Sequence, residues 1–195
     1  MENRLPITSP TAHSEVASLL RGAGVVVAGS AFVALCSHVA LPLWFTPVPL
    51  TLQPFAVLLL GLILSPRLAA ATLGAYLLEG AAGLPVFAPG FALGGGLAHL
   101  LGPTGGYLMS YPAAAALVSW LRARVTRGFA GAVLSAAAGN VAILLCGFVW
   151  LAVWTHAAVA SAFMLAVLPF LPGDALKVVA AAGIVSGMDH IRRNR

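Results

Sequence analysis

Long apolar runs alternate with short polar breaks along most of this 195-residue chain. We interpret six of these runs as membrane-spanning helices, because crossing a bilayer takes a helix of about 20 mainly apolar residues. The six runs cover residues 22–43, 54–64, 68–84, 105–121, 128–154 and 174–188. The second run is short, so it either extends back through the proline-rich residues before it or stops below the outer surface. The pattern predicts an all-α integral membrane protein.

A seventh apolar run, residues 157–168, is too short to be a span. It closes on Pro169 and Pro172, and a helix of about a dozen residues does not cross a hydrocarbon core about 30 Å thick. We therefore expect a short re-entrant or interfacial helix before the last span.

The positions of the arginines favour six spans over seven. With six spans and a cytoplasmic N-terminus, every arginine falls on the cytoplasmic side, as the positive-inside rule requires. Their positions are 4, 21, 67, 122, 124, 127, 192, 193 and 195. A seventh span would place the last three outside. We therefore expect a multi-pass protein of the cytoplasmic (inner) membrane with both termini cytoplasmic.

This topology divides the chain into a cytoplasmic N-terminal segment (1–21), a six-helix membrane domain (22–191) and a basic cytoplasmic tail (192–195). The first twenty residues are mixed and polar and contain no apolar core of the signal-peptide type, so no cleavage is expected.

Composition agrees with a membrane protein, since 61% of the residues are hydrophobic and 8% are charged. The net charge of +5 does not indicate nucleic-acid binding, because the basic residues lie in short gaps between apolar runs. The predicted outer loops, residues 44–53, 85–104 and 155–173, contain no Asp, Glu, Lys or Arg and are rich in Gly and Pro. Long uncharged loops over one face are typical of a lid or a binding surface.

The stretch Pro172-Gly173-Asp174 with Lys177 places a carboxylate and the single lysine at the start of the last apolar run. Asp174 is a good N-cap residue, and i, i+3 spacing puts Asp174 and Lys177 on one helix face. Charges within a span are costly and are usually paired or functional. The pair is either a snorkelling lysine neutralised by its neighbour or part of a ligand site, and we favour the ligand site.

Glu79 is a third intramembrane charge, in the outer part of the third run and near the C-terminal end of that helix. The helix dipole disfavours an anion at that position, so the carboxylate is expected to be paired, protonated or bound to a ligand. Pairing with Lys177 is the purely structural alternative.

The segment Gly102-Pro103-Thr104-Gly105-Gly106-Tyr107 leads into the fourth run. A helix N-terminus with accessible backbone suits an anion, although close helix packing explains the glycines equally well. An intramembrane enzyme is the alternative of a different class, because His38, His99 and His156 lie near the outer side. The chain contains neither G-x-S-x-G nor H-E-x-x-H, so we expect no catalysis, no metal and no cofactor.

Five motifs in order carry a family resemblance. They are Leu41-Pro42-Leu43, Thr46-Pro47-Val48-Pro49-Leu50-Thr51-Leu52-Gln53, Gly83-Leu84-Pro85-Val86-Phe87, Gly102-Pro103-Thr104-Gly105-Gly106-Tyr107 and Pro172-Gly173-Asp174 with Lys177. Together they closely resemble the BioY family of biotin transporters. The resemblance implies a six-helix substrate-binding subunit (S component) of an energy-coupling-factor (ECF) transporter. It also implies a transmembrane coupling protein and two cytoplasmic ATPases as partners, and biotin as the transported substrate.

By the same resemblance, the polar residues of the third span and of the last-span motif contact the ligand, which assigns Glu79, Asp174 and Lys177 to the site. Biotin has two ureido N–H donors, a carbonyl and a carboxylate, so acceptors and a cation both suit it. Lys177 meets either the carbonyl or the carboxylate. Four further residues are expected as contacts, with core or turn roles as the alternative: Thr51, Gln53, Phe91 and Tyr107.

S components dock to the coupling protein through small residues of the first helix. Here Gly24, Ala28 and Ala31 share one helix face, whereas Ser30, Ala34 and Ser37 share a neighbouring one. An Ala-x-x-x-Ala pair is absent from residues 22–43, and packing within the chain is the alternative role for these residues. A carrier of another vitamin and a membrane scaffold remain alternative functions.

Overall fold

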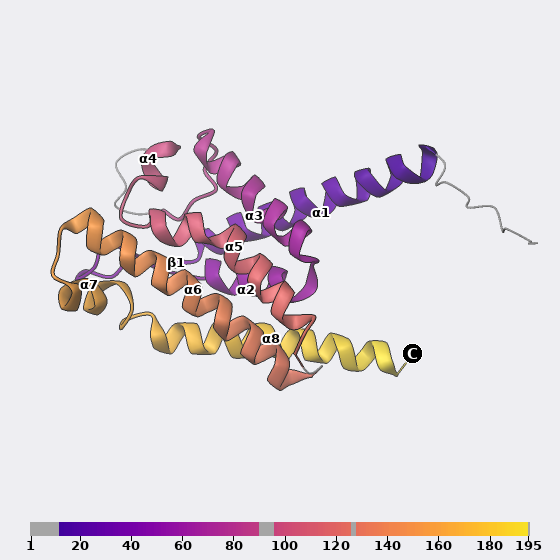
Figure 1. Ribbon diagram of the computed structural model, residues 1–195. Coiled ribbons are helices and arrows are strands. Elements are labelled where there is room, and N and C mark those ends of the chain that lie inside the picture. The colour runs from indigo at the N-terminus through magenta and orange to yellow at the C-terminus, as the bar shows by residue number, and fades with distance from the viewer. Residues whose placement is uncertain (1–11, 90–95, 126–127, 195) are drawn as a thin grey trace, which may run out of the picture.

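The computed structural model describes residues 12–89, 96–125 and 128–194, and it is a bundle of helices (Figure 1). Six helices form the body: α1 (Ala12–His38), α2 (Gln53–Ile63), α3 (Pro66–Ala81), α5 (Gly105–Arg122), α6 (Phe129–Thr155) and α8 (Leu171–Arg193). Two short helices, α4 (Leu97–Leu100) and α7 (Val159–Ala166), and two two-residue strands, β1 (Ala40–Leu41) and β2 (Leu50–Thr51), lie in the connections.

The all-α prediction is confirmed, and each of the six long helices falls on one predicted apolar run. α7 lies within the run predicted to form a short helix. Two starts were misplaced. α1 begins ten residues before the predicted span, because residues 12–21 contain no Gly or Pro and are mostly good helix formers.

α8 begins before the predicted N-cap. Pro172 occupies the first turn, where a missing N–H costs nothing, so the Pro-Gly pair starts the helix instead of preceding it. Asp174 is therefore inside the first turn and is not the N-cap, and its own N–H donates to the Phe170 carbonyl at 2.8 Å.

Within the described residues, three helices are long and apolar enough to cross a bilayer by length and composition: α1, α6 and α8. α2 has 11 residues, which is roughly 16 Å of helix at 1.5 Å per residue. The reading in which this run extends back as a helix through the proline-rich residues is therefore wrong, and α2 alone is shorter than a hydrocarbon core of about 30 Å. The chain before α2 continues as the small antiparallel pair of β1 and β2, in which Ala40 faces Thr51 and Leu41 faces Leu50.

α2 lies at the centre of the bundle and packs against α1, α5, α6 and α8. Small residues permit this close packing, as is usual between membrane helices. A Cβ at Gly139 of α6 would collide with Val118 of α5, and a Cβ at Gly61 of α2 would meet the same side chain and the Ala115 carbonyl. Exposed hydrophobic side chains cover the outside, including Leu35, Leu78, Val153 and Leu176, as expected of a lipid-facing surface.

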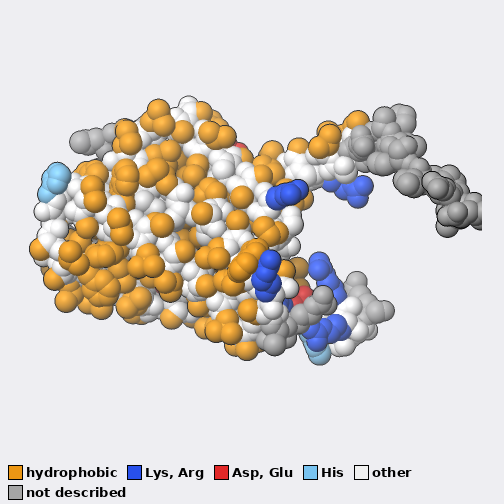
Figure 2. All heavy atoms as spheres, in the orientation of Figure 1, with side chains coloured by type: hydrophobic (Ala, Val, Ile, Leu, Met, Phe, Trp, Pro, Cys, Tyr) orange, Lys and Arg blue, Asp and Glu red, His pale blue; other side chains and the backbone are white. Residues whose placement is uncertain are grey.

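The two ends of the bundle differ. α4, α7 and β1 gather at one end, which we call the loop end, and α8 finishes at the opposite end (Figure 1). The Lys and Arg side chains visible in Figure 2 lie at that opposite end and along the projecting start of α1. We call this second end the arginine end, and the wide face between the two is mainly hydrophobic (Figure 2).

Candidate functional site

A pocket with about 520 Å³ of empty space, part of it open to solvent, lies at the loop end. Its walls come from the β2–α2 junction, α5, α6 and α8. The lining is mostly apolar and aromatic, with few polar groups: Val48, Pro49, Thr51, Gln53, Pro54, Ala88, His99, Thr104, Tyr107, Leu108, Tyr111, Ile143, Leu144, Phe170, Asp174 and Lys177. A pocket of this composition fits a compact, partly apolar ligand that carries a polar group.

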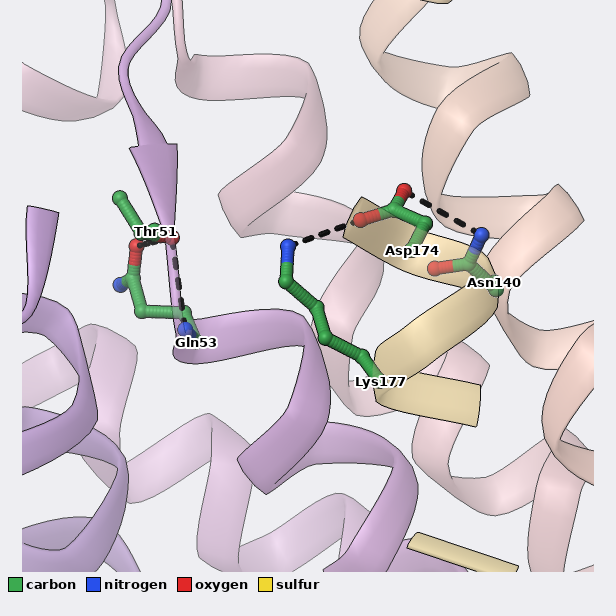
Figure 3. Close-up of polar contacts among 5 residues, drawn as sticks. All are labelled: Thr51, Gln53, Asn140, Asp174 and Lys177. Atoms are coloured by element: carbon green, nitrogen blue, oxygen red, sulfur yellow. Dashed lines mark hydrogen bonds and ion pairs between the residues drawn. The ribbon is translucent and has the colours of Figure 1, made fainter. Parts of the chain in front are cut away.

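The charged part of the pocket is the pair formed by Asp174 and Lys177. The Lys177 ammonium Nζ donates to Asp174 Oδ1 at 2.8 Å, and only 10% and 5% of the two side chains are exposed. The predicted i, i+3 placement on one face of α8 is confirmed. In Figure 3 the ammonium lies between the Asp174 carboxylate and the start of α2. A buried ammonium has three donors, and the contacts found for the described residues use one of them.

Asn140 of α6 supports the carboxylate from the other side. Its Nδ2 donates to Asp174 Oδ2 at 3.3 Å, so both oxygens of Asp174 are engaged (Figure 3). Within the described residues, the Asn140 Oδ1 atom is buried and has no hydrogen-bond partner. Asn140 was not among the predicted contact residues. The available signal was a lone amide in the middle of the 128–154 apolar run, because a polar side chain inside a span is costly without a role.

Opposite the ion pair, Thr51 and Gln53 begin a chain of hydrogen bonds. The Thr51 hydroxyl donates to Gln53 Oε1 at 3.1 Å, and Gln53 Nε2 donates to the Tyr76 hydroxyl at 2.6 Å. Tyr76 in turn donates to the Val86 carbonyl at 2.9 Å. These hydrogen bonds fix the orientation of the Gln53 amide and connect the start of α2 to α3 and to the loop after α3.

The aromatic wall is tied to α7. The Tyr107 hydroxyl donates to the Ala166 carbonyl at 2.6 Å, and Thr46 donates to the Leu165 carbonyl at 3.0 Å. The ring of Tyr107 lies where a Cβ at position 147 would be, which explains why α6 has Gly147 there. Two side chains from different elements thus hold the end of α7 against the pocket.

His99 of α4 borders the pocket beside Phe87, with 5.1 Å between the ring centroids. Burial lowers the pKa of His99, because the imidazolium loses hydration on leaving water. The imidazole is therefore held in its neutral form near neutral pH.

Five of the seven predicted contact residues line this one pocket: Thr51, Gln53, Tyr107, Asp174 and Lys177. Glu79 does not lie among them. Its carboxylate accepts a hydrogen bond from Ser30 of α1 at 2.9 Å and lines a separate groove between α1 and α3. Glu79 therefore neither pairs with Lys177 nor lines the pocket. Phe91 lies outside the described residues.

The predicted docking residues Gly24, Ala28 and Ala31 lie on an exposed face of α1. The neighbouring face is used within the chain, because Ser30 and Ser37 are buried and Ser37 donates to the Val86 carbonyl at 2.7 Å. Of the two faces that the sequence offered, only the first is open.

Comparisons with known proteins agree with this geometry. The chain matches the family model described as the BioY family over residues 8–194. It is 42% identical over 151 residues to the probable biotin transporter BioY of Pyrococcus horikoshii, covering 77% of this chain and 86% of that protein. The biotin transporter BioY of Thermotoga maritima is 35% identical over 153 residues, covering 78% and 86%.

A solved structure supports the same assignment at the level of the fold. The crystal structure of the S-component for biotin from an ECF-type ABC transporter aligns with a TM-score of 0.78 at 26% identity, covering 93% of this chain and 95% of that chain. With a family model spanning nearly the whole chain, similar relatives and a matching architecture, this chain belongs to the BioY family.

Proposed function

We propose that this chain is the biotin-binding S component of an ECF-type transporter and serves biotin uptake across the cytoplasmic membrane. The observation that carries the proposal is the buried Asp174–Lys177 pair in an otherwise mostly apolar pocket at the loop end. Its relatives are named biotin transporters and its structural neighbour is an S component for biotin. The chain acts by binding and carrying its substrate, and no enzymatic step is assigned to it.

The ureido group of biotin places an N–H donor and a carbonyl acceptor side by side. Asp174 Oδ1 and Lys177 Nζ place an acceptor and a donor 2.8 Å apart, so Asp174 accepts from the N–H and Lys177 donates to the carbonyl. The thiophane ring fits the apolar and aromatic lining, and Thr51 and Gln53 offer hydrogen bonds on the facing side. This assignment leaves the valerate carboxylate free of Lys177.

Equilibrium binding of radiolabelled biotin to the purified full-length chain tests the function. Biotin methyl ester should compete nearly as well as biotin, because the ester keeps the ureido group and loses only the carboxylate. Failure of the ester to compete would place Lys177 on the carboxylate instead. Absence of biotin binding, with tight binding of another labelled vitamin, would favour the alternative function as a carrier of that vitamin.

The membrane arrangement that we propose has six spans with both termini cytoplasmic. The clustering of Arg side chains at one end of the bundle supports it (Figure 2). In a background lacking Cys36 and Cys146, single cysteines at positions 67, 124 and 193 should resist an impermeant thiol reagent in intact cells. Labelling at position 193 alone would mean that the segment containing α7 crosses the membrane.

The partners that we propose are a transmembrane coupling protein and two cytoplasmic ATPases, docked through the exposed face of Gly24, Ala28 and Ala31. Small residues permit a second helix to approach closely. Ala28→Leu/Ala31→Leu should weaken complex formation and leave biotin binding intact, whereas Ala180→Leu on the exposed face of α8 should change neither. Retention of the complex by the double variant would move the docking site elsewhere.

A further inference from the structure

A second, larger cavity lies at the arginine end. It has about 1400 Å³ of empty space, part of it open solvent, between the last residues of α2, the start of α3, and the ends of α5 and α8. Its charged lining consists of Arg122, Asp189, Arg192 and Arg193. Nothing in the proposed binding of biotin uses this cavity.

The cavity has an excess of positive charge. Arg122 is paired with Asp189, with 2.8 Å between Nη2 and Oδ2. Three arginines against one carboxylate leave two positive charges. Arg192 and Arg193 supply them, since neither of the two ion pairs found in the described part of the chain includes either residue. The fixed charge of this cavity therefore selects for an anion.

The start of α3 adds further donors to the same cavity. Ser65, its N-cap residue, makes no capping side-chain hydrogen bond, and Pro66 occupies the first turn. Both residues line the cavity. The first-turn N–H groups and the positive end of the helix dipole favour the same negative charge as the arginines.

Apart from Ser119, the remaining lining is apolar and includes Leu62, Leu64, Val125 and Val185. The cavity also lies near the level of a membrane interface. Trp120 is half exposed two residues before the end of α5, and the Arg124 guanidinium stacks on its ring at 3.8 Å. A Trp–Arg pair is typical of the boundary between headgroups and acyl chains.

We propose that this cavity binds an anionic phospholipid, with its phosphate held by Arg192, Arg193 and the start of α3 and its acyl chain along the apolar lining. A free phosphate matches the arginines but leaves the apolar wall unused, whereas a phospholipid matches both. Basic cavities between membrane helices on the cytoplasmic side are suited to lipid headgroups. The positive-inside rule explains the sign of this end, but it does not explain why two arginines that form no ion pair within the described residues border a cavity next to a helix N-terminus.

Two arginines outside the cavity, Arg21 and Arg124, serve as the matched control for the loss of positive charge. Arg21 Nε donates to the Ala17 carbonyl within α1, and Arg124 stacks on Trp120. Arg192→Gln/Arg193→Gln and Arg21→Gln/Arg124→Gln therefore remove the same charge, the first inside the cavity and the second outside it. Both variants are accepted for the test only if they elute as single species and melt cooperatively.

The test uses the full chain in neutral detergent, titrated with phosphatidylglycerol, phosphatidylcholine or inorganic phosphate. Bound lipid is counted by native mass spectrometry and stability is followed by thermal melting. The wild type should retain phosphatidylglycerol and melt at a higher temperature with it, because a ligand that binds only the folded state stabilises that state. The cavity variant should lose at least about tenfold in apparent affinity, a difference of roughly 1.4 kcal/mol, and the control should keep wild-type affinity.

Three results would overturn the proposal. One is equal retention of phosphatidylcholine and phosphatidylglycerol by the wild type. Another is wild-type affinity for phosphatidylglycerol in the cavity variant. The third is full protection by millimolar inorganic phosphate with no further gain from lipid, which would assign the cavity to a soluble phosphate compound. None of these results depends on biotin binding, so the two proposals fail or stand separately.

Discussion

α8 carries an ion pair near each end, and the two pairs differ in what they join. Asp174 and Lys177 lie one turn apart on α8 itself, and both side chains are almost fully buried. Arg122 and Asp189 come from α5 and α8, and 31% of the Asp189 side chain is exposed. The distance is 2.8 Å in both pairs. The first ion pair therefore joins two residues of a single helix, whereas the second holds two helices together at the arginine end.

This difference bears on the reason for each pair. Burying two charges costs several kcal/mol per ion, which the attraction between them offsets only when the geometry is favourable. The Arg122–Asp189 pair keeps partial contact with water and links two helices. The Asp174–Lys177 ion pair joins two residues of one helix at a larger desolvation cost, and it borders a pocket. A ligand that uses both charges is the simplest physical reason for keeping it.

The largest expected effect on biotin affinity comes from removing the Asp174–Lys177 pair. Asp174→Asn/Lys177→Met should stay membrane-inserted and folded, because replacing both members of a buried pair is often neutral for stability. Each lost hydrogen bond to a charged group costs on the order of 1.5–3 kcal/mol, so biotin affinity should fall by at least about tenfold to hundredfold. Equilibrium binding of labelled biotin and a thermal melt measure the two quantities.

The matched control is Arg122→Gln/Asp189→Asn, which removes the other pair from the opposite end of the same helix. It should lower the melting temperature and leave biotin affinity within about threefold of the wild type, a change under 1 kcal/mol. If instead Asp174→Asn/Lys177→Met is folded and keeps wild-type biotin affinity, the assignment of the site is wrong.

A smaller effect on biotin affinity is expected at Asn140, an uncharged residue that contacts Asp174. Asn140→Leu removes the donor to Asp174 Oδ2 and should weaken biotin binding by roughly tenfold, the worth of one hydrogen bond to a charged group. Ser135→Ala on the same helix is the control, because the Ser135 hydroxyl donates to the Gly131 carbonyl within α6. Equal losses in the two variants would point to a general effect on α6.

His99, at the loop end, should make the stability of the protein depend on pH. Its pKa is lowered in the folded state, so the unfolded chain binds the proton more readily and stability is lost as the pH falls below the usual histidine value of about 6.5. The melting temperature should therefore fall between pH 8 and pH 5.5, and it should fall less in His99→Gln. An identical fall in both proteins would show that other groups are responsible.

The smallest expected effect concerns Glu79, whose carboxylate belongs to neither pair. Glu79 accepts from Ser30 in the groove between α1 and α3, so Glu79→Gln should leave biotin affinity within about twofold of the wild type, a change under 0.5 kcal/mol. A tenfold loss in the folded variant would place Glu79 at the ligand, as the family resemblance implied.

The spacing of apolar and charged residues along the sequence was enough to predict the long helices and one contact within a helix. Apolar runs predicted the six long helices, since a helix in a membrane satisfies its own backbone hydrogen bonds whatever it packs against. The i, i+3 spacing predicted the Asp174–Lys177 contact, because residues one turn apart on a helix meet without help from the rest of the fold. The start of α8 was misread for a local reason as well, since Pro in the first turn begins a helix as readily as it ends one.

Only the tertiary structure decided contacts between distant segments. Arg122 and Asp189 are 67 positions apart, and no periodicity links them. The depth of Glu79 in its span could be estimated from the sequence, but the direction of its side chain depends on how α3 is rotated against α1, and that rotation is set by packing. Asn140 meets Asp174 for the same reason, because the packing of α6 against α8 brings an isolated amide to the carboxylate.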